Sequence, residues 1–395
     1  MGEITSFMSK GIPPKYVERE NENTVRVLNQ KCNRNFEINY EESRLHDCSK
    51  KKVPADKMLR PGDVLINSTG TGTAGRVAQL YDVPTSTTID GHMILLRPTE
   101  EIDSIYYGYA VKAFQPQIET LAEGSTGQTE INRKRLQEEI VISFPKEKET
   151  QERIAHFLLN IDEKIKVNNK INKNLEQQAM AIFNNAIEQS KSVTYVELES
   201  LADVKGGKRL PKGANLMSIP NSHPYIRVRD LNDVVFASLS ANYEYVDDKT
   251  QKTISRYITT TDDVLISIVG TIGLTAIVDK SLNMANLTEN CVKVTNLHGI
   301  SPEYLLLYLR SQHGSEEIKK GTVGAVQAKL PIKNIQALSV PLLPQSDLQS
   351  LNDTLKVLFN QLSINVAESK CLTDIRDSLL PKLMSGELDV SNLDL

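Results

Sequence analysis

The sequence predicts an α+β protein with a pseudo-twofold internal repeat, in which two similar strand-rich α/β globules are separated by two long helices that pair as an antiparallel coiled coil. Two observations predict this fold. Residues 62–68 (GDVLINS) return as residues 262–267 (DDVLIS), and a Gly-Thr pair follows each copy, at Gly70 and at Gly270. A long segment with Leu and Ile at heptad spacing then closes each repeat. Each copy is large enough to be a domain rather than one unit of a solenoid.

The first repeat, residues 16–145, alternates short β-branched runs with Gly, Pro, Asn and Asp, and this pattern predicts strands separated by turns. The expected strands are 64–66, 87–89, 93–96 and 140–142. Residues 102–122 predict a helix that ends or kinks near Gln115, because Pro116 cannot supply the amide that a continuous helix needs.

The second repeat follows the same order. Its expected strands are 234–236, 264–269, 276–278 and 292–294, and a helix with Pro in its first turn is expected from Pro302 to Arg310. Further matching segments are 25–27 with 226–228, 124–127 with 321–324, and 136–145 with 335–344. We therefore divide the chain into a first globule (1–145), a helical spacer (146–192), a second globule (193–344) and a C-terminal helical spacer (345–395).

The two long segments carry a heptad pattern. Residues 148–189 contain neither Pro nor Gly, and a continuous helix of that length would span roughly 60 Å. The seam positions advance in steps of four and three, as in a coiled coil. They are Ile154, Leu158, Ile161, Ile165, Asn168, Asn172, Leu175, Ala179 and Ile182 in the first helix, and Leu348, Leu351, Leu355, Leu358, Leu362, Asn365, Ser369, Leu372, Arg376 and Leu379 in the second.

Polar residues interrupt each seam near its middle. Antiparallel pairing would bring Asn168 and Asn172 near Asn365 and Ser369, and matched buried polar layers would fix register and orientation. The order globule, helix, globule, helix favours the same pairing, because it would set the globules at opposite ends of one rod. The alternative is two unrelated amphipathic helices, each packed on its own globule.

Composition bounds the class of protein. The chain has 395 residues, of which 39% are hydrophobic and 24% charged, and it contains no run of 18 apolar residues, so we expect a globular protein without a membrane span. The four cysteines form no CxxC pair and the N-terminus lacks a secretory pattern, so we expect a cytoplasmic protein without disulfides. Cys32, His46 and Cys48 match no usual zinc spacing, so no metal site is expected.

Residues 70–75 (GTGTAG) fit the G-x-G-x-x-G pattern of dinucleotide sites, with Asp90 near the place of a ribose-binding acid. A helix must follow such glycines to hold the pyrophosphate, whereas the residues that follow here predict strand and turn. The second repeat keeps only part of the pattern. We therefore expect a polar turn, whose backbone amides and neighbours Asn67, Ser68 and Thr69 could approach a phosphate.

Basic residues gather locally, although the net charge is -4. Residues 205–229 hold six of them and no acidic residue, and shorter basic runs lie at 50–52 and 133–135. A basic stripe of this length is what contact with phosphates requires, and the alternative is a solvated face. No catalytic pattern of His, Ser or Cys is recognisable, and the glycine and Asn/Asp-Pro-Pro motifs of DNA methyltransferases are missing. We expect a protein that binds and does not catalyse.

Taken together, these features resemble the specificity (S) subunit of type I restriction-modification systems. The resemblance rests on the two (Gly/Asp)-Asp-Val-Leu-Ile motifs, the turns at 124–127 and 321–324, the runs 140–145 and 338–344 before the helices, and the tail 377–388 (DSLLPKLMSGEL). It covers nearly the whole chain. The first repeat departs from the family pattern by starting almost at Met1, with little N-terminal arm.

The resemblance implies that each globule is a target recognition domain for one half of a bipartite, asymmetric double-stranded DNA sequence. The paired helices would set the spacing of the half-sites and dock two modification subunits. Those subunits would carry S-adenosylmethionine and methylate adenine, and restriction subunits, where they join, would use ATP and Mg. This chain would hold no cofactor and no catalytic residue.

Candidate DNA-contacting residues follow from side-chain chemistry. Basic side chains can contact phosphates, and Asn and Gln can bind adenine through two hydrogen bonds. Arg227 and Arg229, expected in a strand beside Tyr225, could bind guanine or the DNA backbone. The candidates are Lys15, Tyr16, Arg26, Asn29, Gln30, Asn67, Ser68 and Thr69 in the first globule, and Lys205, Lys208, Arg209, Lys212, Tyr225, Arg227 and Arg229 in the second. Arg26 and Arg227, which the repeat aligns, could instead form structural salt bridges.

Two other classes of function stay open. A coiled-coil scaffold would bind two protein copies and no DNA, and globules without a basic surface would favour it. A nucleotide-dependent enzyme would use residues 70–75, and thermal stabilisation by a dinucleotide would reveal it.

Overall fold

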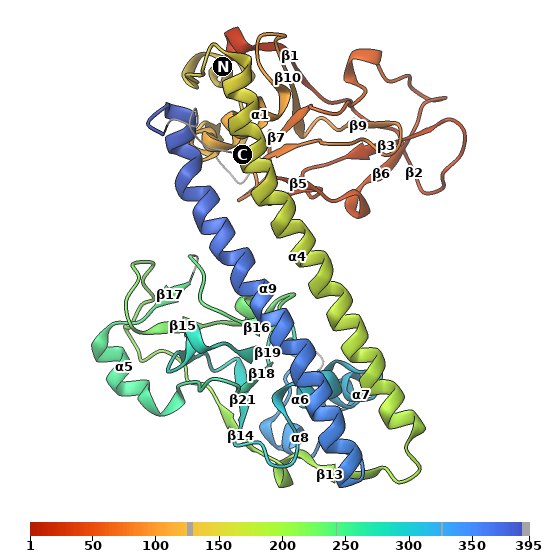
Figure 1. The fold of residues 1–395 in the computed structure, drawn as a ribbon, viewed down its shortest axis with the longest axis vertical. Coiled ribbons are helices and arrows are strands. Elements are labelled where there is room, and N and C mark those ends of the chain that lie inside the picture. Colours follow the sequence, from red (N-terminus) through yellow and green to blue (C-terminus); the bar gives the residue numbers. More distant parts are fainter. Residues whose placement is uncertain (125–128, 242, 325–326, 389–395) are drawn as a thin grey trace. The chain divides into compact units, whose positions relative to one another are not determined.

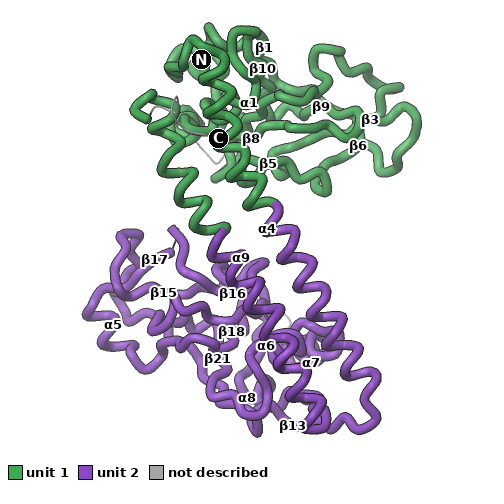
Figure 2. Tube along the Cα trace, in the orientation of Figure 1, with its two compact units in different colours: residues 1–166, 369–395 green, residues 167–368 purple. Residues whose placement is uncertain are grey.

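Figure 1 shows the fold in the computed structural model, which describes residues 1–124, 129–241, 243–324 and 327–388. The chain divides into two compact units, residues 1–166 with 369–395 and residues 167–368 (Figure 2). This grouping differs from the four consecutive segments expected from the sequence, because the core of each globule packs against parts of both long helices. Most of the expected turn at 124–127 lies outside the described residues.

In its described residues, the first unit contains two four-stranded sheets, two hairpins and three short α-helices. One sheet has the order β1 (Thr5–Lys10), β10 (Met93–Pro98), β7 (Val64–Asn67) and β8 (Val77–Gln79), and the other has the order β2 (Tyr16–Val17), β6 (Arg44–Asp47), β3 (Thr24–Leu28) and β9 (Thr87–Ile89). The hairpins pair β4 (Asn33–Arg34) with β5 (Glu37–Ile38) and β11 (Ala122–Glu123) with β12 (Glu130–Ile131). The helices are α1 (Ser104–Ala113), α2 (Gln115–Thr120) and α3 (Arg133–Glu139).

Strand β7 lies between two layers, which explains why its sequence is continuously apolar. Val64 and Ile66 belong to the core that the sheet forms with the helices, where Tyr106 of α1 is also buried. Leu65, one residue away on the other face, packs in a second core with Leu28 of the other sheet. The helices, the sheet that contains β7 and the second sheet are therefore three successive layers.

The second unit repeats this architecture. Its larger sheet has the order β14 (Asp203–Gly206), β21 (Cys291–Thr295), β18 (Val264–Ser267), β19 (Thr275–Val278) and β16 (Phe236–Ala237), and a smaller one has the order β17 (Glu244–Tyr245), β15 (Pro224–Ile226) and β20 (Asn286–Leu287). A two-stranded sheet pairs β13 (Thr194–Glu197) with β22 (Ser339–Leu342). The helices are α5 (Asp248–Ile254), α6 (Pro302–Arg310), α7 (Gln312–Gly321) and α8 (Ile332–Gln336).

The repeated aspartate of the DVLI motif forms a buried ion pair in each unit. Asp63 accepts from Arg97 Nε at 2.7 Å, and Asp263 accepts from Lys293 Nζ at 3.0 Å. Each carboxylate also accepts the backbone amide three residues earlier, at 2.8 and 2.7 Å. The motif repeats because the same side chain caps the turn before the central strand and neutralises a base on the neighbouring strand.

Most expected strands and helices lie within one or two residues of the observed ones. The helix expected over 102–122 breaks at Phe114, beside the predicted Gln115. The strand expected at 140–142 is wrong: α3 occupies the residues before it, and no partner strand lies beside it among the described residues. The matching residues of the second unit do form a strand, β22, because β13 pairs with it.

The long helices α4 (Lys148–Gln189) and α9 (Gln345–Ser385) pair antiparallel. In the second unit Asn365 donates to Asn172 at 2.9 Å in a buried hydrogen bond, and Asn168 donates to Glu368 at 2.7 Å. The expected polar layer is therefore present, with Asn168 bonded to the residue before Ser369. Amides that satisfy each other inside an apolar seam stabilise one register over its neighbours.

Most other expected seam residues are buried or half-buried, as a coiled-coil seam requires. Ile182 is an exception, since it is 37% exposed while the next residue, Phe183, is buried. The ring centroid of Phe183 lies 5.0 Å from that of Tyr304 in α6. A straight helix drifts relative to a strict heptad, so near the end of α4 the adjacent residue takes over the buried position.

Candidate nucleic-acid interface

The acid-free basic segment of the second unit is anchored at both ends of its loop. Gly207 passes so close to the chain after β20 that a Cβ there would lie 2.0 Å from the carbonyl oxygen of Thr288, so no larger residue fits. Leu210 and Leu216 pack on a small buried cluster that includes Tyr225. The charged residues between these anchors are thereby turned outwards.

Five of the six basic residues of this segment are exposed, namely Lys205, Lys208, Arg209, Lys212 and Arg229. Lys205 and Arg209 each form an ion pair, at 2.9 and 2.7 Å, and the ammonium of Lys208 lies 5.3 Å from the centroid of a tyrosine ring. Lys212 is exposed in the same loop. Exposed ion pairs contribute little stability, so these side chains can exchange a carboxylate for a phosphate at small cost.

Arg227 and Arg229 share the carboxylate of Glu244. Nη2 of Arg229 lies 2.8 Å from one carboxylate oxygen, and Nη1 of Arg227 contacts the same oxygen. The arginine side chains remain 42% and 53% exposed. The prediction that both lie in a strand is wrong: β15 ends before Arg227, and residues Val228–Leu231 form a 3-10 helix because Asp230 accepts the Arg227 amide at 2.7 Å.

Three expected contact residues are buried, and their assignment to the DNA surface is corrected. Tyr225 is 4% exposed and donates its hydroxyl to the carbonyl oxygen of Lys208 at 3.0 Å. Asn67 and Ser68 are both 0% exposed. The Asn67 amide donates to the carbonyl oxygen of Gln30 at 3.0 Å, so this end of β7 is covered by the chain after β3 and is not a free loop tip.

Lys15 and Tyr16 lie beside each other at the start of β2. Lys15 is exposed, whereas Tyr16 is half-buried. The guanidinium carbon of Arg44 lies 3.4 Å above the centre of the Tyr16 ring, a cation–π contact that fixes both side chains. Burial raises the pKa of Tyr16, with Asp90 adding to the shift. Arg44 was not among the sequence candidates, since nothing in the sequence links it to Tyr16.

Asn29, Gln30 and Thr69 make hydrogen bonds within the protein. Asn29 donates to the carbonyl oxygen of Glu42 at 2.9 Å and accepts a backbone amide at 2.9 Å. The Thr69 hydroxyl lies 3.2 Å from Gln30 Oε1 and 2.8 Å from a ring nitrogen of His92. A contact with adenine through Asn29 or Gln30 would have to replace these bonds.

The alignment of Arg26 with Arg227 is wrong. The carbonyl of Leu28 accepts a hydrogen bond from the residue after β9 at 2.9 Å, and the carbonyl of Ile226 accepts the same bond from the residue after β20 at 3.1 Å. Leu28 therefore corresponds to Ile226, because strand pairing and not a three-residue likeness sets the register. Both arginines do form ion pairs, Arg26 with Glu20 at 3.8 Å, but at places that are not equivalent.

Residues 70–75 form a loop between β7 and β8. Gly70 and Gly75 have φ values of 115° and 93°, which side-chain-bearing residues rarely adopt. The chain then enters β8 and not a helix, so this loop offers no helix N-terminus for a pyrophosphate. Gly270 and Gly273 hold the matching turn of the second unit with φ values of 82° and 85°.

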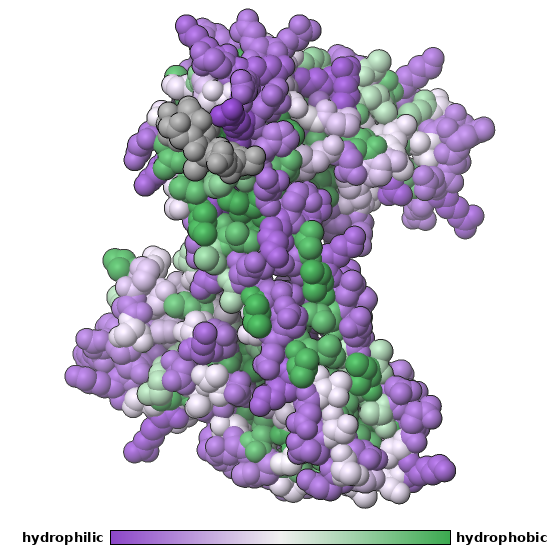
Figure 3. Space-filling model, viewed as in Figure 1, coloured by the Kyte–Doolittle hydropathy of each residue, from purple (hydrophilic) through white to green (hydrophobic). Residues whose placement is uncertain are grey.

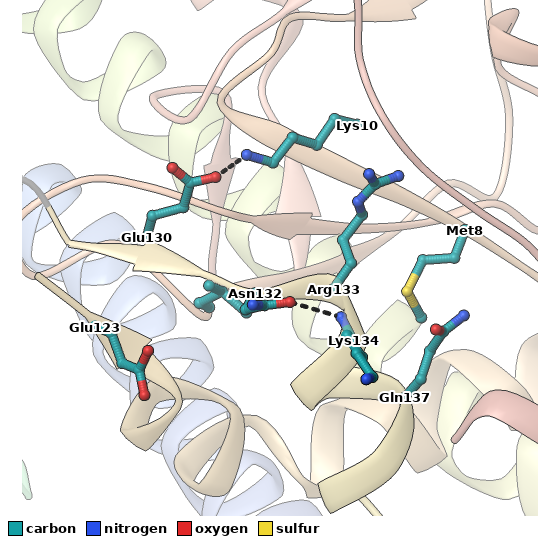
Figure 4. Close-up of a pocket in the computed structure, with 9 residues that line it drawn as sticks. Met8, Lys10, Glu123, Glu130, Asn132, Arg133, Lys134 and Gln137 are labelled. Atoms are coloured by element: carbon teal, nitrogen blue, oxygen red, sulfur yellow. Dashed lines mark hydrogen bonds and ion pairs between the residues drawn. The ribbon is translucent and has the colours of Figure 1, made fainter.

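Figure 4 shows a groove of about 650 Å³ beside β1 and α3 in the first unit. Lys10 forms an ion pair with Glu130 there, and Arg133 also lines the groove. Arg135, on the same short helix, pairs with Glu123 and a second carboxylate. The basic run 133–135 therefore borders a surface of mixed charge.

His46 is buried, and its ring nitrogens bond to the backbone. Nδ1 accepts the amide of Lys15 at 2.8 Å, and Nε2 lies 2.8 Å from the carbonyl oxygen of Lys51. Within the described ranges, no group of three or more His, Cys, Asp and Glu side chains could hold a metal ion. No helix in that part of the chain is long and apolar enough to cross a membrane.

Comparisons with known proteins agree on one family. The profile of the family described as "Type I restriction modification DNA specificity domain" matches residues 1–177 and 190–372. The Type I restriction enzyme MjaIX specificity subunit of Methanocaldococcus jannaschii is 23% identical over 383 residues, which are 90% of this chain and 83% of that protein. The Type-I restriction-modification system S subunit from M. genitalium has a TM-score of 0.56 at 17% identity, covering 97% of this chain and 94% of that one.

Proposed function

The chain belongs to the family of type I restriction-modification DNA specificity subunits, and we propose that it reads a bipartite, asymmetric DNA sequence with its two globules. In this proposal the chain itself is not catalytic. Two modification subunits dock on it, bring S-adenosylmethionine and methylate adenine, and restriction subunits can join them.

The observation that carries this proposal is one scaffold used twice with different exposed side chains. The buried ion pairs of Asp63 and Asp263 and the close approaches of Gly11 and Gly207 recur in both units. The acid-free basic stretch occurs in the second globule only. A shared frame with different surfaces suits a protein that binds DNA at two places and reads a different sequence at each.

Exposed apolar residues on the long helices support docking of the modification subunits. On α9, Val357 is 69% exposed, Ile364 is 61% exposed and Ile375 is 41% exposed. Val357 and Ile364 are about two helical turns apart, and Ile364 and Ile375 about three, so all three lie along one face of α9. Figure 3 shows such apolar residues, in green, interrupting the polar surface along the helices. In this proposal these three side chains are contacts for a modification subunit, because exposed apolar side chains gain free energy when a protein partner covers them.

Methylome sequencing tests the proposal. A host would express the modification subunit encoded beside this chain, with and without the chain, and adenine methylation would be mapped. We expect a gapped adenine-methylated motif that occurs only with the chain, which also delivers both half-sites. If no such motif occurred with a copurifying modification subunit that is active in vitro, the chain would be a scaffold and the DNA-reading proposal would be wrong.

A further inference from the structure

The two globules place chemically different residues at equivalent positions on one exposed corner. Leu28 and Ile226 are equivalent, because each accepts the same backbone bond from the neighbouring parallel strand. In the antiparallel pairing, Arg44 lies opposite the residue before Leu28, and Glu244 lies opposite the residue before Ile226. Arg44 and Glu244 therefore occupy the same place, and the charge there is reversed.

The same register makes the residues that follow β3 in the first globule equivalent to those that follow β15 in the second. Asn29 and Arg227 each close an identical turn, in which the carbonyl accepts the amide three residues later, at 2.9 and 3.0 Å. Lys31 is then equivalent to Arg229. We define the corner by these three positions: Asn29, Lys31 and Arg44 in the first globule, and Arg227, Arg229 and Glu244 in the second.

Beneath the corner the two globules agree. Leu28 and Ile226 are both 0% exposed, and each belongs to the apolar core between the two sheets. Gly11 and Gly207 lie at equivalent close approaches, where a Cβ would meet a carbonyl oxygen at 2.1 and 2.0 Å. The scaffold is therefore held constant while the exposed residues change, which is the pattern expected of positions that set sequence preference.

In the second corner, Arg227 and Arg229 both contact the carboxylate of Glu244. Glu244 is 27% exposed and contacts both guanidinium groups, and this shared contact favours the rotamers that bring the two arginine side chains together. Asp230 also pairs with Arg229 at 3.6 Å, so two carboxylates face the two guanidinium groups, and the arginines, 42% and 53% exposed, keep donors for a ligand. Guanine presents O6 and N7 as adjacent acceptors in the major groove, the pair that an arginine fork matches best.

The first corner has an arginine, Arg44, at the position that Glu244 occupies in the second corner. Its arginine, Arg44, is stacked on Tyr16 at 3.4 Å, and Asn29 stands where the second globule has an arginine. The two corners therefore present different donors and acceptors from the same backbone position, and a target read by both would be asymmetric.

We propose that Glu244 is a positioning residue that holds Arg227 and Arg229 to read one guanine in the major groove of the half-site bound by the second globule. The inference rests on the proposed function, since it names the base read and the residue that orients its readers. Glu244 does not touch the DNA in this scheme. Its role is to hold the guanidinium groups in the plane of the base before binding.

The test replaces each guanine of that half-site in turn by 7-deazaguanine, which lacks only the N7 acceptor. Binding of the whole complex, the chain with its modification subunits, is measured for each DNA. We expect about a tenfold loss of affinity at one position, the cost of one bond of a bidentate pair. In Glu244→Ala this discrimination should fall to within about twofold, because the arginines are no longer held.

Two further variants sharpen the test. Glu244→Gln keeps one acceptor oxygen and should retain part of the discrimination. Glu289→Ala is the matched control, because it releases Arg209 from an exposed ion pair of 2.7 Å in the same globule and should keep the full tenfold effect. The readout is a ratio between two DNAs for one protein, so a fraction of misfolded variant does not change it.

The inference is overturned if wild type tolerates 7-deazaguanine everywhere in the half-site, if that half-site has no guanine, or if Glu244→Ala keeps the tenfold effect. In these cases the complex still prefers its methylated motif, and the proposed function stands. A complex that binds the motif no better than unrelated DNA would instead overturn the proposed function itself.

Discussion

At the scale of single residues, the two repeats reach the same backbone conformation with different amino acids. Gly62 and Asp262 stand at the same turn before the central strand, with φ values of 89° and 70°. An aspartate in this left-handed region is strained by its Cβ, whereas a glycine is not. Burial also raises the pKa of the Asp262 carboxyl, so its charged form is disfavoured there.

Asp262→Gly is therefore expected to stabilise the second unit by about 1 kcal/mol, since it relieves the left-handed strain at small entropic cost. The measurement is the thermal unfolding midpoint of the variant against wild type. Gly62→Ala is the reciprocal control and should lower the midpoint, because the same strain appears and the new Cβ would lie 3.1 Å from that of Ser104. A lower midpoint for Asp262→Gly would contradict the argument.

Lys112 is a half-buried base of α1 whose ammonium nitrogen is buried. Its ammonium lies 3.8 Å from Asp162 and 4.2 Å from the centre of the Phe36 ring, and no hydrogen-bond acceptor is within reach among the described residues. Desolvation lowers its pKa to about 8 although the Asp162 carboxylate opposes the shift. Asp162 also pairs with Arg376, so it does not depend on Lys112 for a partner.

Because the folded pKa of Lys112 lies below its unfolded value of 10.5, the unfolded chain binds more protons between about pH 8 and 10.5, and this residue makes stability rise with pH across that window. Lys112→Met should stabilise the first unit at pH 7 by on the order of 2 kcal/mol, and the gain should shrink as pH rises through the window. Denaturant midpoints at pH 7 and pH 10 measure both effects. A gain that stays constant with pH would exclude Lys112 as their source.

At the scale of elements, the paired long helices and the basic segment after β14 are held in place by different means. A buried hydrogen bond of 2.9 Å between the side-chain amides of Asn365 and Asn172 aligns the two helices, and it selects one register at some cost in apolar burial. The basic segment after β14 is held by Gly207 and by two leucines, and it carries its charges outwards. The heptad periodicity of the long helices determines their pairing, whereas the conformation of the basic segment depends on the surface against which it packs.

Replacing Lys208, Arg209 and Lys212 together by Ala should weaken DNA binding and flatten its salt dependence. The slope of log K against log salt should fall by about one unit for each phosphate that the variant no longer neutralises. A triple variant of Lys319, Lys320 and Lys333, which lie outside the segment in the same globule, is the charge-matched control. An unchanged slope in the first variant would remove the segment from the DNA interface.

At the scale of the whole molecule, α4 and α9 each contribute residues to both compact units. The first unit takes α4 up to Lys166 and α9 from Ser369, and the second takes the remainder of each helix. The two globules are therefore linked by continuous helical backbone and not by a loop. This connection is the physical basis for proposing that the helices set the distance between half-sites.

A heptad inserted after Lys166 in α4, with a matching heptad before Ser369 in α9, should lengthen the preferred gap between half-sites. Seven helical residues add roughly 10 Å, which corresponds to about three base pairs of B-form DNA. The methylated motif of the insertion variant measures the gap. Insertion into α4 alone is the control, since it misaligns the paired seams and should abolish methylation; an unchanged gap in the double insertion would exclude the ruler role.

The sequence by itself determined the repeat, the two long helices and the central strands of both globules. These features depend on local periodicity: a seam of apolar residues such as Leu351 and Leu355, or a run buried on both faces such as 64–66, has few alternatives to helix or strand. The turn before each central strand was also predictable, because its aspartate recurs. The family followed from the same repeated motifs.

Only the tertiary structure decided which candidate side chains face solvent. Asn67 and Tyr225 looked available in the sequence but are buried, because chain segments distant in sequence cover them. The likeness of 25–27 to 226–228 suggested a register that strand pairing overrides, and Glu244 and Arg44 became equivalent only through that pairing. Burial and register depend on contacts between distant strands, and neither propensity nor spacing along the chain encodes which strands meet.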